Sequence, residues 1–139
     1  MEANLDRFIK AHEENYSEAI AEIRSGKKRS HWMWYVFPQL KGLGSSETAN
    51  YYGLRNIDEA TEFLHHPILG ENLVRICKAL EGINGKSAYA IFGTPDDLKL
   101  HSSLTLFSLV KETNPIFQQL INTYFDGKPD QLTLKLLAK

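Results

Sequence analysis

The sequence predicts an all-α protein, a compact single helical domain over residues 1–139 with about seven helices and short connections. Three observations lead to this fold class. Apolar residues recur at steps of three and four along most of the chain. Signals for helix starts and helix ends follow one another at intervals that suit ordinary helices. No internal repeat, linker or low-complexity tract divides the chain, and 139 residues are enough to bury one core.

The first helix is predicted between Asn4, a capping residue, and Gly26, a residue that commonly ends helices. Its apolar face includes Phe8, Ile20 and His12. A histidine on an apolar face is usually buried and bonded to a neighbour. We therefore favour that role for His12 over a catalytic one.

Six further helices are predicted from caps, prolines and apolar stripes. Their start signals are Ser45 or Ser46, Asn56, Pro67, Thr94-Pro95 with acids in the first turn, Asn114-Pro115, and the region of Pro129. The helix after Asn56 should end near His66, because a proline disfavours helix at the residue before it. Cys77 lies on an apolar stripe, so we interpret it as a small core residue rather than a nucleophile. The run LTLFSL, Leu104 to Leu109, alternates like a strand, but its flanking signals frame a helix, which we prefer.

The composition is that of a folded protein near electrical neutrality. Hydrophobic residues make up 42% of the chain and charged residues 24%, as in globular domains. A net charge of −1 argues against a general polyanion binder, so nucleic-acid binding ranks low. One cysteine cannot form an internal disulfide, and no signal peptide or membrane-spanning run is evident. We expect a cytoplasmic, monomeric protein with no membrane partner.

Familiar catalytic and metal-binding motifs are absent from the sequence. The five histidines and one cysteine show no HExxH, CxxC or similar ligand spacing, so no metal and no cofactor is predicted. GxSxG and phosphate-loop patterns are also missing, because the GLGSS run lacks the GK[ST] ending. Whether the protein is an enzyme stays open at this point.

The first candidate site is the aromatic run SHWMWYVFPQLKGLGSS, Ser30 to Ser46, which follows a basic turn. As a ligand site it would bind an anion at a loop that leads into a helix, stack a planar ring and hydrogen-bond its edge. The residues expected in these roles are Lys28, Gly44 and Ser46 for the anion, Trp32 or Tyr52 for stacking, and His31 and Gln39 for the edge. The alternative is a core helix that buries its tryptophans and ends at Pro38, and it is favoured on sequence alone.

The second candidate site lies on one helix and comprises Asp96, Lys99, Ser102 and Ser103. A lysine beside a serine activates a hydroxyl only where burial lowers the lysine pKa. The alternative is a solvent-facing strip with an Asp96–Lys99 pair, and we favour it over catalysis. The catalytic candidates, all of them weak, are His31, Lys99 and Ser102.

The runs GKKRSHWMWYVFPQLKGLGSS, YYGL, HHPILGENL, IFGTPDDLKLHSSLTLF and GKPDQLTLKLL resemble the bacterial domain-of-unknown-function family 1810, whose members are often labelled calpastatin. The resemblance covers nearly the whole chain and implies a compact, mainly helical single domain. It carries no activity. Leu104 stands where the family usually has methionine. The family pattern implies importance for the polar positions Lys28, His31, Gln39, Ser46, Tyr52, His66, Asp96, Lys99, Ser102, Ser103 and Thr105.

Three functional hypotheses follow. The leading one is a pocket for a small anionic or nucleotide-like ligand, in which Lys99, Ser102 and Ser103 face the same cavity as His31 and Gln39. The second is a protein-interaction or regulatory module that uses its tryptophans as a surface anchor. The third is single-stranded nucleic-acid binding through the basic turn and its neighbouring aromatic residues.

Overall fold

The computed structural model describes residues 5–138. These residues form nine α-helices and no strand, which confirms the all-α fold. The helices are α1 Asp6–Arg24, α2 Met33–Val36, α3 Glu47–Tyr52, α4 Ile57–His65, α5 Leu69–Glu81, α6 Ala88–Phe92, α7 Asp96–Ser108, α8 Ile116–Phe125 and α9 Gln131–Leu137. No helix within residues 5–138 is both long enough and apolar enough to cross a membrane.

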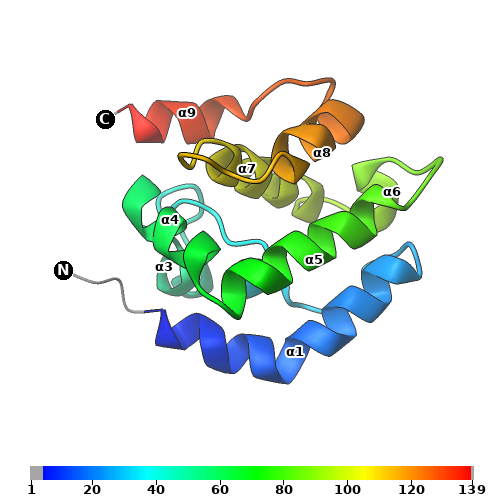
Figure 1. Ribbon diagram of the computed structural model, residues 1–139, viewed down its shortest axis with the longest axis horizontal. Coiled ribbons are helices and arrows are strands. Elements are labelled where there is room, and N and C mark those ends of the chain that lie inside the picture. The colour runs from blue at the N-terminus through cyan, green and yellow to red at the C-terminus, as the bar shows by residue number, and fades with distance from the viewer. Residues whose placement is uncertain (1–4, 139) are drawn as a thin grey trace.

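The helices pack around one core. Helices α1 and α5 lie side by side, and α7, α8 and α9 cover the opposite side of the molecule (Figure 1). A line of aromatic rings joins these layers, from Phe8 of α1 through Phe63 of α4 and Phe107 of α7 to Phe117 of α8, with neighbouring ring centroids 5.1, 5.6 and 5.7 Å apart. Buried aromatic surface of this extent contributes strongly to the stability of a small domain.

Most of the predicted helix boundaries are confirmed. Gly26, just beyond α1, has a φ of +85°, the left-handed conformation that glycine adopts without strain. The Asn56 side chain accepts a 2.9 Å hydrogen bond from the Glu59 amide at the start of α4. Asp126 and Gly127 both have positive φ where α8 ends. The predicted cap of the first helix, Asn4, lies outside the described residues.

The start of α7 differs from the prediction. Thr94 was expected to cap this helix with Pro95 as its first helical residue, but Pro95 itself lies at the cap position with φ −89° and ψ 9°. Helix α7 therefore begins one residue later, at Asp96. The helix then continues through the Leu104–Ser108 part of the LTLFSL run, as preferred from the flanking signals. Leu104, Leu106 and Phe107 are all buried, which explains why this run does not show a one-sided helical pattern.

The two helices beyond the expected seven are α2 and α6, with four and five residues. Helices of this length complete little more than one turn, so a periodicity of 3.6 residues cannot reveal them. Cys77 on α5 is fully buried, and burial raises the pKa of its thiol. Its predicted role as a small core residue is confirmed.

Candidate functional site

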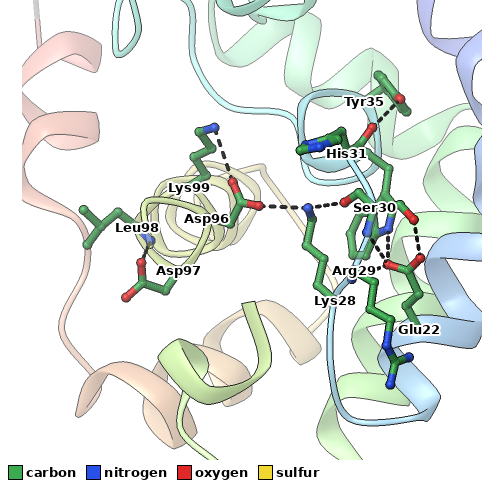
Figure 2. A network of polar contacts seen from close by, with 11 residues as sticks. Glu22, Lys28, Arg29, Ser30, His31, Tyr35, Asp96, Asp97, Leu98 and Lys99 are labelled. Carbon is green, nitrogen blue, oxygen red and sulfur yellow. Dashed lines mark hydrogen bonds and ion pairs between the residues drawn. The ribbon is translucent and has the colours of Figure 1, made fainter. Parts of the chain in front are cut away.

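The loop between α1 and α2 is organised by a buried carboxylate near the end of α1. Glu22 is 8% exposed. Its Oε1 atom accepts hydrogen bonds from the backbone amides of Arg29 (2.7 Å) and Ser30 (2.9 Å) and from Trp32 Nε1 (2.9 Å). The loop is therefore folded around Glu22 (Figure 2).

Glu22 is ionised at neutral pH in spite of its burial. Burial alone would raise its pKa, but hydrogen bonds from Ser30, Arg29 and Trp32 together outweigh that effect and lower the pKa to about 2. The carboxylate is thus a fixed negative charge that holds the loop in one conformation.

This loop directs Lys28 towards the start of α7. The Lys28 ammonium lies 2.8 Å from Oδ2 of Asp96, the first residue of α7, and its side chain is only 6% exposed. It also donates a hydrogen bond to the Ser30 carbonyl oxygen and lies 5.0 Å from the centre of the Trp32 ring. A lysine this deeply buried needs such partners, because an unpaired buried charge is costly.

Lys99 approaches the same carboxylate from the next turn of α7. Its ammonium lies 3.3 Å from Asp96 Oδ1 and 3.8 Å from the centre of the Trp34 ring. Figure 2 shows Asp96 between the two lysines, with Lys28 on one side and Lys99 on the other. We call Lys28, Asp96, Lys99 and Trp34 the lysine cluster. Two ammonium groups share one carboxylate, so these residues carry a net positive charge.

Two further predicted residues belong to the surroundings of this cluster. His31 is exposed and directly follows Ser30, and its carbonyl oxygen accepts a 2.8 Å hydrogen bond from the Tyr35 hydroxyl. Ser103 lies one turn beyond Lys99 on the same face of α7 and is 1% exposed. Within residues 5–138 the Ser103 hydroxyl has no hydrogen-bond partner.

Ser102 points in a different direction from its neighbour. Its hydroxyl lies 3.2 Å from Asp130 Oδ2, and it lies at the same distance from the Leu98 carbonyl oxygen. Asp130 in turn caps α9 by accepting a hydrogen bond from the Thr133 amide. Ser102 therefore contacts the segment that leads into α9, whereas Lys99 contacts Asp96 and Trp34.

Of the two tryptophans, Trp34 rather than Trp32 is accessible beside the lysines. Trp32 is 1% exposed, and its ring packs near Phe37 and Phe92 at centroid distances of 6.2 and 6.4 Å. Trp34 is only partly buried. Trp34 was not selected from the sequence. Two residues that are two positions apart in a helical conformation point to nearly opposite sides, and this spacing could have indicated that Trp34 and Trp32 face different surroundings.

The other candidates of the first site have local structural contacts. The Ser46 hydroxyl accepts a 3.1 Å hydrogen bond from the Ala49 amide and so caps α3. A side chain at Gly44 would come within 2.8 Å of the Ala49 Cβ atom, so this position is tightly packed. The Gln39 carbonyl oxygen accepts from the Leu54 amide at 2.9 Å. Tyr52 stacks at an angle against Phe8 and Tyr35 and belongs to a separate aromatic group.

The histidines show no arrangement for metal binding. His12 is buried, as predicted, and its Nε2 atom lies 2.6 Å from the Tyr35 carbonyl oxygen. Burial lowers the pKa of His12. The hydrogen bond to the Tyr35 carbonyl raises the pKa in part, and the nearby His66 lowers it further. Nowhere in the described part of the chain do three or more histidine, cysteine, aspartate or glutamate residues gather as a metal site would require.

Comparison with known proteins relates the whole chain to a family and to a solved structure. A family model described as "Protein of unknown function (DUF1810)" matches residues 2–137. The crystal structure of the conserved hypothetical protein Rv1873 from Mycobacterium tuberculosis is 44% identical in sequence and has a TM-score of 0.95, covering 97% of this chain and 96% of that chain. No curated protein matches the chain.

Proposed function

This chain belongs to the DUF1810 family of proteins of unknown function, and we propose that it binds a small anionic, nucleotide-like ligand at the lysine cluster. The observation that carries this proposal is the sharing of Asp96 by the ammonium groups of Lys28 and Lys99, at 2.8 and 3.3 Å. One carboxylate cannot neutralise two cations, so the cluster retains a charge that an anion would balance.

The two lysines differ in how firmly they are held, and this difference suggests where the ligand binds. Lys28 is nearly buried at 6% exposure, and it also donates to the Ser30 carbonyl oxygen. Lys99 is 20% exposed. An ammonium group has three N–H donors, so Lys99 can turn towards an incoming phosphate or carboxylate while Lys28 keeps Asp96 in place.

Trp34 supports a ligand with a planar ring. The Lys99 ammonium lies 3.8 Å from its ring centre, a cation–π contact between the charged and the aromatic part of the cluster. When Lys99 turns to an anionic group, this aromatic surface becomes available for a heterocyclic base. His31, exposed at the edge of the same loop, is placed to hydrogen-bond the ligand.

The unpaired hydroxyl of Ser103 adds a second line of support. Buried hydroxyl groups almost always have a hydrogen-bond partner, yet the Ser103 hydroxyl has none in the described residues. It lies on the same face of α7 as Asp96 and Lys99. A ligand or an ordered water at the cluster would provide that partner.

We also propose a cytoplasmic location in a bacterium. Cys77 is buried as a free thiol, which suits a reducing compartment. A bacterial source is consistent with the similarity to Rv1873 from Mycobacterium tuberculosis.

The test is a thermal-shift and fluorescence titration with phosphate, pyrophosphate and nucleoside mono-, di- and triphosphates. A ligand present at a hundredfold its dissociation constant should stabilise the protein by about 2.7 kcal/mol. Stacking on Trp34 should change the tryptophan emission at the same concentrations. Lys99→Met should abolish both signals. Lys135 is an exposed lysine of α9, so Lys135→Met removes the same charge elsewhere and should leave both signals unchanged.

Two results would contradict the proposal. One is the absence of a shift with every phosphate-containing compound. The other is a shift that Lys99→Met and Lys135→Met reduce equally, because that would mean a diffuse charge effect rather than a site.

A further inference from the structure

A separate cavity of about 450 Å³ lies where α1 meets α2 and α3. Three tyrosines, Tyr35, Tyr51 and Tyr52, line it together with charged residues of α1. Its volume is in the range of small-molecule sites. We propose that this cavity binds a small alkylated ammonium cation, such as the trimethylammonium group of choline. The proposal does not depend on ligand binding at the lysine cluster.

The tyrosine rings stand to one another as neighbouring walls of a box. The centroids of Tyr35 and Tyr52 are 5.1 Å apart with their planes at 62°, and those of Tyr51 and Tyr52 are 4.9 Å apart at 82°. Rings set at such steep angles around a corner can present their negative faces to one central cation. Flat apolar ligands would instead favour parallel rings.

The positions of two of these rings are fixed by contacts outside the cavity. The Tyr35 hydroxyl donates a 2.8 Å hydrogen bond to the His31 carbonyl oxygen. The Tyr52 ring packs against Phe8 at a centroid distance of 5.7 Å. Tyr51 is 60% exposed and forms the outer wall. A box with two fixed walls and one exposed wall is open to a compact cation.

Charged side chains of both signs line the cavity. Arg7 lines it, but its guanidinium is bound to Glu59 at 3.0 Å and to the Tyr51 carbonyl oxygen at 2.7 Å. The lining otherwise contains the carboxylates of Asp6 and Glu14 and the ammonium of Lys10. Glu59 pairs with Arg55 at 3.1 Å as well as with Arg7, so the preference for a cation comes from the tyrosine faces and the Glu14 carboxylate beside them rather than from the net charge of the lining.

Glu14 lies close enough to the tyrosines to affect their titration. Burial raises the pKa of Tyr35 and of Tyr52, and the Glu14 carboxylate contributes further in both cases. The phenols are therefore neutral at physiological pH. A carboxylate next to neutral aromatic faces is the combination that binds a cation of low hydration energy, such as a quaternary ammonium group.

The experiment is a calorimetric titration of the full chain with choline chloride and with tetramethylammonium chloride, against sodium chloride at equal ionic strength. The decisive comparison uses the neutral isostere of choline, in which a tert-butyl group replaces the trimethylammonium group. The two compounds have nearly the same shape and differ in charge. We expect choline to bind with a dissociation constant on the order of 1 mM and the isostere to bind at least about tenfold more weakly.

Three variants locate the binding. Tyr51→Ala should weaken choline binding about tenfold, and Glu14→Gln about threefold. Lys10→Met should strengthen it, because a competing cation is removed. Tyr89→Ala is the matched control, since Tyr89 is 64% exposed and is not among the residues lining the cavity.

The proposal is overturned if the isostere binds as tightly as choline, because the pocket would then recognise shape alone. It is also overturned if Tyr51→Ala and Tyr89→Ala bind choline equally, or if neither cation binds at a concentration on the order of 50 mM. Binding of choline that is lost in Tyr51→Ala but retained in Lys99→Met confirms that the cavity is distinct from the lysine cluster.

Discussion

Glu22 and Asp96 are two carboxylates at either side of the same loop, and their surroundings are opposite in kind. Glu22 is bonded to neutral donors that are fixed in place: the amides of Arg29 and Ser30 and the indole of Trp32. Asp96 is bonded to two ammonium groups at the ends of lysine side chains. The first arrangement is a single negative charge held by neutral donors of the folded loop, whereas the second has a net positive charge carried by two long side chains.

The energetic consequences differ accordingly. Backbone amides in a folded loop cost no side-chain entropy when they bind a carboxylate. A lysine loses up to about 2 kcal/mol of rotamer freedom when it is held in one geometry. Partly exposed ion pairs therefore contribute little, typically about 0 to 1 kcal/mol. We infer that Glu22 stabilises the loop while Asp96 holds two cations that can change partner.

The largest effect is expected from Glu22→Ala. This change leaves two amides and the indole N–H of Trp32 without their acceptor in a buried position. We expect a loss of about 3 to 5 kcal/mol in the free energy of unfolding, measured by urea denaturation. Glu18→Ala is the matched control: Glu18 is an exposed glutamate one turn earlier, which contacts the Ser30 hydroxyl. A loss of equal size in both variants would show that Glu22 has no special structural role.

Acidification should remove the contribution of Glu22 to the free energy of unfolding in the wild-type protein. The pKa of Glu22 in the folded protein is about 2, below its ordinary value of 4.5, so the unfolded chain binds the proton first. The contribution, on the order of 2 to 3 kcal/mol, is therefore complete above about pH 5 and is lost as pH falls towards about 2. Urea denaturation across this range should show a shallower fall for Glu22→Gln than for the wild type. Parallel curves would contradict the lowered pKa.

Replacing the lysines of the cluster should have smaller and coupled effects. Lys28→Met should cost about 1 to 2 kcal/mol, because Lys28 is nearly buried, and Lys99→Met less than about 1 kcal/mol. Both cations share Asp96, so the double variant should lose more stability than the two single variants together. We expect this difference, the coupling energy of a double-mutant cycle, to be about 0.5 kcal/mol or more. Strict additivity would mean that Asp96 does not connect them.

The smallest effect concerns the two tryptophans. Trp32 is 1% exposed and Trp34 partly buried, so an aqueous quencher should reach one indole and leave the other protected. Trp34→Phe should leave only the protected emission and change the unfolding free energy by no more than about 1 kcal/mol. Lys99→Met should alter the emission of the accessible component, because its ammonium lies 3.8 Å from the Trp34 ring centre. An unchanged quenching curve in Trp34→Phe would show that Trp34 is not the accessible ring.

The sequence predicted the helices well where local chemistry defines them. The Asn56 cap and the Gly26 terminus are local signals, and both occur where expected. Helix α2 lies in the aromatic run, where the favoured alternative expected a core helix that ends at Pro38. Helix α6 was missed because it is too short for a periodic pattern. Thr94 was wrongly expected to cap α7, since Pro95 itself lies at the cap position and the helix begins at Asp96.

The candidate site was predicted in part. Lys28, Asp96 and Lys99 were selected by residue type and helical spacing, but the contact between Lys28 and Asp96 joins segments far apart in the sequence, so no local pattern reveals it. The same limit applies to Glu22, because no sequence feature indicates that its hydrogen-bond donors lie seven to ten residues later. The partly buried Trp34 could have been distinguished from the fully buried Trp32 only by knowing that the chain is helical from Met33 to Val36.

The buried thiol of Cys77 provides a reporter for opening of the whole domain. It is the single cysteine of the chain, it is fully buried in α5, and burial raises the pKa of the thiol. A thiol reagent can therefore modify it only after the core around α5 separates and the thiolate forms. When reclosing is faster than labelling, the modification rate measures the equilibrium between closed and open forms. Each variant and each bound ligand described above should thus change the logarithm of this modification rate in proportion to its effect on the free energy of opening.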